Sequence, residues 1–269
     1  MPRHVSSLLG LHATGPVRLV LAIAVAPGPD GDEGLAIDEE LVVEHEGVPV
    51  PVEEAVDQHG TRLHLVDVDE GEVEVRYRAR VAGRAAPAPV DPLDTIRYLR
   101  PSRYCESDIL LPTAIEMFGA LSGLEQLRAV TDWVRDHLTY APGASGPTDG
   151  ATATLLARAG VCRDFAHVVV AHLRALDVPA RTVAVYAPGL EPMDFHAVVE
   201  ALVDGEWHVV DATGLAPREV MVRVATGRDA ADIAFLTTIG APIVFERMEV
   251  TARAESLPKE DPRAPVLLG

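Results

Sequence analysis

The pattern of apolar and polar residues in the first third of the chain is that of β-strands. From Val73 to Val81 every odd-numbered residue is apolar and every even-numbered residue is charged, which is the period of two that one buried strand face requires. Four further runs are strand-like and are separated by Gly, Pro or Asp residues: 17–26, 41–43, 48–52 and 63–68. Together these runs predict a small antiparallel β-sandwich.

A different pattern begins after a stretch rich in Ala and Pro at residues 85–92, which is typical of an extended linker. Residues 124–138 carry apolar side chains three and four positions apart, as one buried helix face requires. A short helix is expected at residues 152–159 and a longer one from about 161 to 176, with Gly160 between them. The middle of the chain is therefore predicted to be helical.

Strands are expected again after the last of these helices, at residues 181–186, 195–203, 207–212 and 243–250. Asp204-Gly205, between the second and third of them, indicates a tight hairpin. The pattern predicts an α+β protein with three parts: an N-terminal β-sandwich domain at 1–88, an α+β core at 89–252 and a polar C-terminal tail at 253–269.

Charge and composition narrow the class of protein. The 269 residues include 41 acidic and 23 basic side chains, for a formal net charge of −18, which argues against nucleic acid or an anionic membrane as a partner. No apolar run approaches the roughly 20 residues of a membrane-spanning helix. Two cysteines, Cys105 and Cys162, are too few for a disulfide framework. We therefore expect a cytoplasmic protein with free thiols, in an oligomeric state that the sequence leaves open.

The sequence predicts no cofactor and no metal. Its cysteines and histidines lack the spacing of a zinc site. It also lacks an EF-hand loop, a phosphate-binding glycine motif and a dinucleotide fingerprint. Any catalysis would then depend on the side chains of the chain itself.

Cys162 is the first candidate for such chemistry. It stands in the opening turn of the helix expected at 161–176, directly after the break at Gly160. Free backbone amides at a helix start favour an anion and so favour the thiolate over the thiol. A single Cys on an apolar helix face is also typical of a small core residue. Both interpretations stay open on this position alone.

A nucleophilic thiolate needs a base, and the ten histidines offer few partners. His167 and His172 share the helix with Cys162 but point away from it, at about 100° per residue. His196 and His208 lie on the two arms of the expected hairpin. A two-residue turn makes His196 the diagonal neighbour of Asp211 on one sheet face, at about 7–8 Å, whereas His208 points to the other face. His196 is therefore the preferred base.

Asp211 is not the only acid that could orient His196. Asp194 and Glu200 share the same face by parity and are rivals for that role. All three acids could instead be ordinary solvent-facing strand residues, because a carboxylate near a histidine is common by pattern alone.

Several stretches resemble the core of bacterial transglutaminase-like proteins, a group that includes proteins described as cysteine proteases. The nucleophile region is similar at residues 159–167 (AGVCRDFAH) and 176–181 (LDVPAR), and the second and third motifs at 194–197 (DFHA) and 210–213 (VDAT). Stretches at 101–108 and 227–232 are also similar, and the resemblance covers roughly residues 93–250. A weaker similarity links the N-terminal β region to the β domain that often precedes this core.

The resemblance implies a papain-like, transglutaminase-like core with the nucleophile at a helix N-terminus packed on an antiparallel sheet. It makes Cys162 the nucleophile, His196 the base and Asp211 the orienting acid. The sequence departs from the family pattern at Val198, where an aromatic residue is usual, and at Ala212, which replaces a frequent Pro. The first of these departures is expected to alter the substrate cleft.

The implied activity is acyl transfer on a peptide or amide bond through a thioester, with hydrolysis as the leading reaction and a peptide or protein as substrate. Transfer to an amine, which would crosslink proteins, uses the same residues, and a non-catalytic peptide-binding module is a third interpretation. The backbone amide of Cys162 is one candidate oxyanion donor, and Tyr140 is a guess for the second. Cys105 is expected to have a structural or cleft-lining role.

Overall fold

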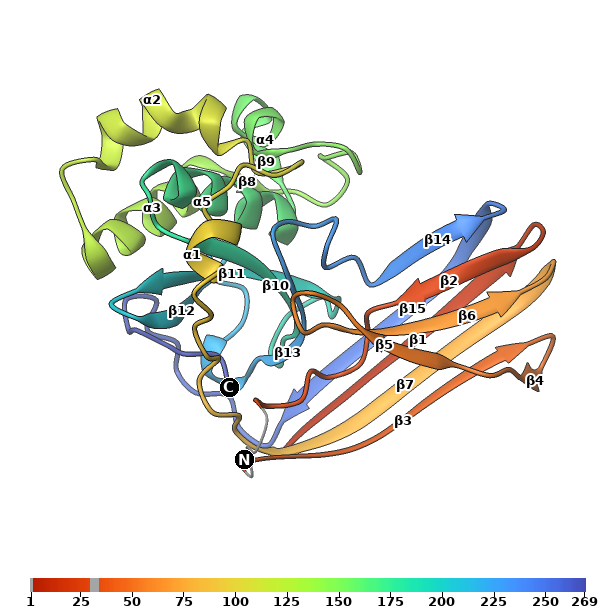
Figure 1. Ribbon diagram of the computed structural model, residues 1–269. Helices are drawn as coiled ribbons and strands as arrows, with labels where there is room; N and C mark the ends of the chain where they lie inside the picture. The colour runs from red at the N-terminus through yellow and green to blue at the C-terminus, as the bar shows by residue number, and fades with distance from the viewer. Residues whose placement is uncertain (1, 30–33) are drawn as a thin grey trace.

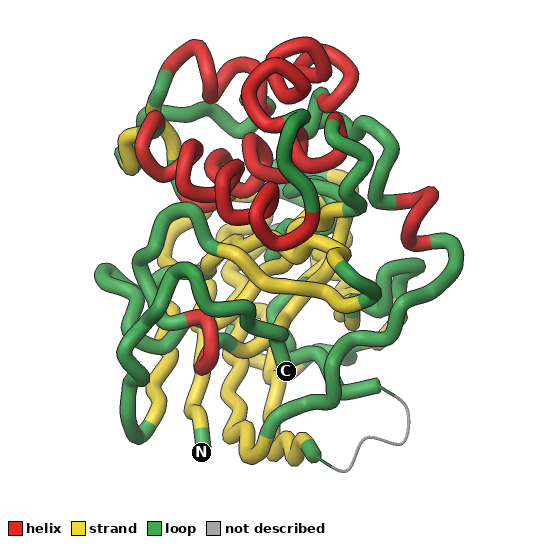
Figure 2. The backbone as a smooth tube through the Cα atoms, turned by 90° about the vertical axis from the view of Figure 1, so that its left-hand side faces the viewer, coloured by secondary structure: helices red, strands yellow, loops and turns green. Residues whose placement is uncertain are grey.

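A computed structural model describes residues 2–29 and 34–269 of the chain. Its helices lie together over a central sheet, and long strands extend away from that sheet (Figure 1). Figure 2 shows most of the helices as one layer above the strands, with two short helical segments outside that layer. The protein is thus an α+β fold with antiparallel sheets, as the sequence predicts. No helix in the described ranges is long and apolar enough to cross a membrane.

The long strands form two antiparallel sheets, which we call the two-sheet region. One sheet has the order β15-β1-β7-β3-β4, with bounds Ile243–Ala254, Arg3–Ala13, Gly71–Gly83, Leu35–His45 and Val48–Pro49. The other has the order β14-β2-β6-β5, with bounds Leu236–Gly240, Val17–Leu21, Arg62–Val68 and Glu53–Val56. Buried residues of both sheets belong to one hydrophobic cluster, so the sheets enclose a common core.

Strand β7 has the alternation of buried apolar and exposed charged residues that its sequence predicts. Val73, Val75 and Val81 are each at most 2% exposed, while the charged residues between them face outward. The apolar run at 17–26 behaves differently, because strand β2 ends at Leu21 and residues 22–26 are buried without strand pairing. There the continuous apolarity reflects burial on all sides rather than strand structure. The sequence pattern did not predict β1, although burial alternates along the whole length of that strand.

The second part of the fold is a four-stranded antiparallel sheet with the order β12-β11-β10-β13. Its strands are Glu206–Val210, His196–Val203, Ala180–Tyr186 and Val222–Gly227. The turn at Asp204-Gly205 pairs Val203 with Glu206, which confirms the predicted hairpin. Strand β13 was not expected, since its short mixed run has no clear alternation that would mark it.

Helices cover one face of this sheet. They are α1 (Asp94–Arg97), α2 (Ser107–Phe118), α3 (Gly123–His137), α4 (Ala151–Ala157) and α5 (Cys162–Ala175), with a short 3-10 helix η1 at Arg218–Val220 and a two-stranded parallel pair, β8 (Thr139–Tyr140) and β9 (Ala159–Gly160). Helix α5 is the central one, and every residue from Asp164 to Ala175 is buried. It contacts α2, α3 and α4 as well as β10 and β11. The element that begins with Cys162 is therefore held from all sides.

Two findings describe how the three predicted parts of the chain are connected. Strand β14 and all but the last two residues of β15 fall within the 89–252 segment, and these strands pair with β2 and β1 of the two-sheet region. The 253–269 tail is docked: Val209 donates a backbone hydrogen bond to Val266, and Leu268 is 3% exposed. Strand pairing joins segments that are distant in sequence, which local composition cannot reveal. Whether the three parts fold as separate domains stays a prediction.

Candidate active site

Asp164 holds the backbone at the start of α5. Its Oδ2 accepts the Val161 N–H at 2.8 Å, and its carboxylate also contacts Arg163 and Ser145. The side chain is fully buried. A Cβ at residue 160 would lie 2.6 Å from the Asp164 Cβ, so only glycine fits there. Gly160 therefore does more than separate two helices. Because it has no side chain, the Asp164 carboxylate has room to lie against the turn that precedes Cys162.

His196 and Asp211 meet on the hairpin. His196 Nε2 lies 2.8 Å from Asp211 Oδ2, and the two residues are 2% and 5% exposed. Thr213 donates its backbone N–H and its hydroxyl to Asp211 Oδ1, at 2.8 and 2.7 Å. The carboxylate thus holds the imidazole with one oxygen and is itself held through the other. The His196–Asp211 contact inferred from the hairpin register is present in the structure.

The rival acids are engaged elsewhere. Asp194 is exposed and accepts the backbone N–H of Phe195 at 2.7 Å. Glu200 is buried between Arg181 and Arg223, with ion-pair distances of 2.7 and 2.5 Å. The two alternatives to Asp211 are therefore removed by geometry, and Glu200 is a buried structural charge rather than a solvent-facing one.

The charges of the site favour an ionised histidine. Burial alone lowers the pKa of His196, but the Asp211 carboxylate and an interaction with the Cys162 sulfur more than offset it and raise the pKa to about 10. Burial acts against ionised Asp211, yet the His196 imidazolium and the Thr213 donors bring its pKa below the usual value. The His196 Nδ1 atom is buried and has no hydrogen-bond partner among the described residues. Since Nε2 faces Asp211, Nδ1 is the ring nitrogen left for the Cys162 sulfur.

Tyr140 lies at the mouth of the site. Strand β8 pairs it with Gly160, two residues before Cys162, and 39% of its side chain is exposed. The Cys162 backbone lies close to the Tyr140 hydroxyl and makes the smallest contribution to its pKa, which it lowers. Burial, followed by the negative charges of Cys162, Asp194 and Asp211, raises the pKa of Tyr140 to about 12. Its hydroxyl therefore keeps its proton near neutral pH and stands beside the Cys162 amide.

Aromatic rings form a row next to the site. Phe195, which precedes His196, stacks on Phe235 with ring centroids 4.9 Å apart, and Phe235 meets Phe245 of β15 at 6.1 Å. Cys162, Phe195 and Phe235 all pack against a hydrophobic cluster that joins buried residues of the two-sheet region to residues of β10, β11 and β13. The two-sheet region thus contributes to the surroundings of Cys162. The sequence pattern did not indicate Phe235 or Phe245, which lie far from Cys162 along the chain.

Other residues singled out from the sequence have structural surroundings. Cys105 is fully buried, which raises the pKa of its thiol to about 12, and its Sγ lies 3.9 Å from the Arg228 carbonyl oxygen. Both Cys105 and Cys162 are free thiols. Val198 is 1% exposed and belongs to the hydrophobic cluster that also holds Val183 and Val209. This buried packing of Val198 does not support the expectation, drawn from the family resemblance, that the residue directly alters a substrate cleft.

The similar stretches at 101–108 and 227–232 bind to each other rather than to the site. Asp229 Oδ2 accepts the Tyr104 N–H at 3.0 Å, and Ala230 N–H donates to Nε2 of His167 at 3.1 Å. Burial lowers the pKa of His167 to about 4, so this residue of α5 is a neutral acceptor. These contacts anchor the middle of α5. No group of three His, Cys, Asp or Glu side chains suited to a metal occurs within residues 2–29 and 34–269.

Comparison with known proteins identifies the family of this core. Residues 113–212 match the Transglutaminase-like superfamily. A solved structure from Cytophaga hutchinsonii, named "Putative Cysteine Protease", is 33% identical and superposes with a TM-score of 0.87 over 97% of this chain and 92% of that one. The periplasmic domain of TgpA from Pseudomonas aeruginosa is 22% identical over 77% of this chain and 86% of that one, with a TM-score of 0.42.

An uncharacterized protein of Mycobacterium leprae is 32% identical over 120 residues, which are 41% of this chain and 43% of that protein. The match thus spans less than half of that relative's length. The Cytophaga structure, by contrast, is similar over nearly the whole of both chains, two-sheet region included. On the matched core and this full-length similarity, the chain belongs to the transglutaminase-like superfamily.

Proposed function

We propose that the protein is a cysteine hydrolase that cleaves peptide or amide bonds through a thioester. The observation that carries the proposal is the buried His196–Asp211 pair, 2.8 Å apart, whose imidazolium is further stabilised by the sulfur of Cys162. A cysteine beside a histidine that is oriented by a third group is the arrangement of activated thiol nucleophiles. The full-length similarity to a protein named as a cysteine protease supports cysteine-dependent catalysis.

In the proposed reaction the Cys162 thiolate attacks the carbonyl carbon of a substrate amide and forms a tetrahedral intermediate. Collapse of this intermediate breaks the C–N bond, and the His196 imidazolium gives its proton to the leaving amine. Neutral His196 then takes a proton from water, whose oxygen attacks the thioester and releases the acid and the Cys162 thiolate, with His196 again an imidazolium. Asp211 keeps the imidazole in one orientation and stabilises its charged form.

Two donors are positioned for the oxyanion of that intermediate. The Tyr140 hydroxyl lies close to both the backbone and the sulfur of Cys162, since both influence its pKa. A substrate oxygen placed between them would accept a hydrogen bond from each, at the start of α5 where the helix dipole also favours negative charge. We therefore propose Tyr140 as the second oxyanion donor.

The competing reaction is transfer of the acyl group to a primary amine, which needs no different residue. The experiment that separates them supplies a peptide-amide substrate together with a labelled primary amine and measures both acid and amide products. Cys162→Ala is the inactive control, and Cys105→Ala is the control for thiol content. We expect acid to be the main product. Amine incorporation that outruns hydrolysis would replace the hydrolase proposal by crosslinking.

A binding module without catalysis would show neither product. It would also leave Cys162 no more reactive toward iodoacetamide at about pH 6 than an ordinary thiol, whereas a thiolate paired with imidazolium reacts faster there.

The two free thiols suit a reducing compartment, and we propose the cytoplasm as the site of action.

A further inference from the structure

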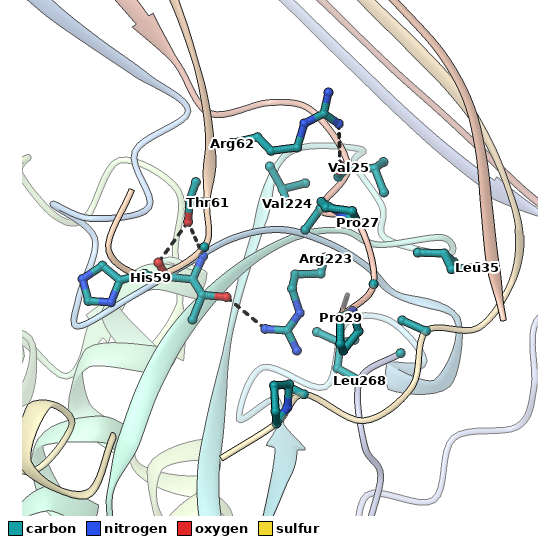
Figure 3. A pocket seen from close by; sticks show the side chains of 18 of the residues that line it. Val25, Pro27, Pro29, Leu35, His59, Thr61, Arg62, Arg223, Val224 and Leu268 are labelled. Carbon is teal, nitrogen blue, oxygen red and sulfur yellow. Dashed lines mark hydrogen bonds between the residues drawn. The ribbon is translucent and has the colours of Figure 1, made fainter. Parts of the chain in front are cut away.

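The two-sheet region is joined to the four-stranded sheet by polar contacts around a cavity of about 520 Å³ (Figure 3). Across this joint the Thr61 hydroxyl donates to the Thr226 carbonyl oxygen at 3.2 Å and accepts the Thr226 N–H at 3.0 Å. The arginines that line the cavity are already paired with acidic side chains or with backbone oxygens. Because these groups are engaged within the protein, the joint serves to fix the position of the two-sheet region beside the candidate active site.

Aromatic rings next to His196 run from the buried core to the surface of the protein. Tyr186 is 0% exposed, and its ring centroid lies 5.6 Å from that of Phe195, which stacks on Phe235. Phe195 and Phe235 are partly buried, and Phe245, the last ring, is 43% exposed. We call Phe195, Phe235 and Phe245 the aromatic row. Its outer part is open to a ligand.

Hydrogen bonds behind the aromatic row hold it in place. The Tyr186 hydroxyl donates to the Ile23 carbonyl oxygen at 2.8 Å, and the Phe235 carbonyl oxygen accepts the Ala22 N–H at 3.1 Å. Ala22 and Ile23 belong to the buried segment that follows β2. Side chains that are held before a ligand arrives lose little conformational entropy when it binds. The two-sheet region therefore presents the row as a preformed apolar surface.

The aromatic row lies on the same side of β11 as Cys162. Ala197 of this strand lines a small void together with Cys162. Residues two apart along a strand point to the same face, so Phe195, which directly precedes β11, faces the same way as Ala197. Phe195 and Cys162 also pack against the same hydrophobic cluster. A substrate bound at the sulfur would therefore lie beside the row.

The proposed reaction assigns one part of the substrate to this side. Because the His196 imidazolium gives its proton to the leaving amine, the amine part of the substrate lies at His196, whereas the carbonyl oxygen points to Tyr140 and the start of α5. Phe195 is the chain neighbour of His196, and the two Cα atoms are about 3.8 Å apart. An extended peptide advances about 3.3 Å per residue. The side chains of the first two residues after the scissile bond thus come within reach of the aromatic row.

We propose that the aromatic row binds large apolar side chains at the first two residues on the amine side of the scissile bond. This inference rests on the proposed function, from which it takes the nucleophile and the base. An amine that attacks the thioester approaches from the side on which the leaving amine departs, so the row also binds apolar amines as acyl acceptors. The substrate class is therefore a peptide with apolar residues directly after the cleaved bond.

The test measures which amines enter the acyl-enzyme. p-Nitrophenyl acetate supplies the acyl group: the Cys162 thiolate attacks the ester carbonyl, the C–O bond breaks, and p-nitrophenol leaves with the imidazolium proton. Leucyl-leucinamide or asparaginyl-asparaginamide then competes with water for the thioester. The nitrogen of the amide probe takes the acetyl group, the C–S bond breaks, and the proton of the amine passes to His196. The two probes have side chains of similar size and differ in polarity.

We expect the leucine probe to be acetylated about tenfold more than the asparagine probe, relative to acetate, as partial burial of leucine side chains gives. Phe245→Ala should reduce this preference about threefold, and comparison between variants cancels the intrinsic reactivity of each amine. Val244→Ala is the matched control, because Val244 is 51% exposed and pairs with His12 on the outer face of the sheet, whereas Phe245 pairs with the buried Leu11. Equal yields from the two probes, or a preference that Phe245→Ala leaves unchanged, would overturn the proposal. A change in oligomeric state alone, seen by light scattering of Phe245→Ala, would assign the ring to self-association instead.

A second measurement separates failure of this inference from failure of the proposed function. A burst of p-nitrophenol that Cys162→Ala lacks shows that the acyl-enzyme forms, and its absence defeats the proposed function. Binding of leucyl-leucinamide to the Cys162→Ala protein, followed by ligand-detected NMR, needs no turnover. It should weaken about threefold when Phe245→Ala is added and stay unchanged when Val244→Ala is added. Equal binding by the three proteins would refute the role of the aromatic row, whatever the burst shows.

Discussion

Charged side chains are mostly exposed in the two-sheet region, whereas several are buried in the core, by which we mean the helices and the four-stranded sheet. In β7 and β3 the ion pair between Arg78 and Glu40 has side chains that are 75% and 53% exposed. In the core, Asp164, Glu200 and Asp211 are essentially buried, and each is held by specific partners. Water solvates the first kind of charge whether or not its partner is present, whereas the second kind depends on its partners entirely. Substitutions in the two regions should therefore differ in both size and kind.

The largest expected effect is on activity, from the two cysteines. Cys162→Ala should lower kcat by at least about 10⁴-fold, because removing the nucleophile removes the covalent route, while circular dichroism and Tm stay near wild type. Cys105→Ala removes a buried thiol that makes no catalytic contact and should retain most of the activity. Comparable activity in Cys162→Ala would refute the assigned nucleophile.

Asp211→Asn tests the buried acid of the core. The imidazole loses the charge that raises its pKa to about 10, so kcat should fall by roughly 10³–10⁴-fold and the alkaline limit of thiolate–imidazolium reactivity should move to lower pH. The measurements are kcat and the pH profile of iodoacetamide alkylation. A profile identical to that of the wild type would show that another group sets the ionisation of His196.

Glu200→Gln and Glu40→Gln compare a buried with an exposed ion pair directly. Glu200→Gln leaves Arg181 and Arg223 without their carboxylate and should lower the free energy of unfolding by about 3–5 kcal/mol. Glu40→Gln removes the exposed partner of Arg78 and should change it by less than about 1 kcal/mol. Urea unfolding of both variants measures the difference. Equal effects would remove the contrast between the two regions.

Tyr140→Phe keeps the ring and removes the hydroxyl beside the Cys162 amide. Loss of one oxyanion donor should lower kcat by about 10²–10³-fold, with little change in KM, because the donor acts on the transition state. Steady-state kinetics on one peptide substrate measure the two constants. A change confined to KM would assign Tyr140 to substrate binding instead.

A further expected effect is a pH dependence of stability. Because the pKa of His196 is raised from 6.5 to about 10, the folded protein binds its proton more tightly than the unfolded chain. The resulting stabilisation is complete below about pH 6.5 and is lost as the pH rises through about 10. Urea unfolding of wild type and His196→Gln between pH 5 and 10 should show a difference that narrows with rising pH. A difference that widens would contradict the sign of this shift.

Local pattern was most informative where residues meet water on one side. Alternation along β7, the turn at Asp204-Gly205 and the glycine before Cys162 are features of neighbouring residues, and the structure contains each of them. The hairpin also makes the position of Asp211 relative to His196 predictable from the sequence alone, since register follows from a two-residue turn. Pattern failed at residues 22–26, where burial on all sides erases periodicity.

What the sequence by itself determined is therefore the general α+β class, several of the helices and strands, and the local geometry within one helix start and one hairpin. Only the tertiary structure decided that the start of helix α5 lies next to that hairpin. It also decided that Glu200 pairs with Arg181 and Arg223, whereas Asp211 pairs with His196. The pairing of β14 and β15 with strands of the two-sheet region was likewise decided by the tertiary structure. The physical reason is that these contacts join residues far apart along the chain. Their energies depend on burial and partner choice, which no local stretch of sequence specifies.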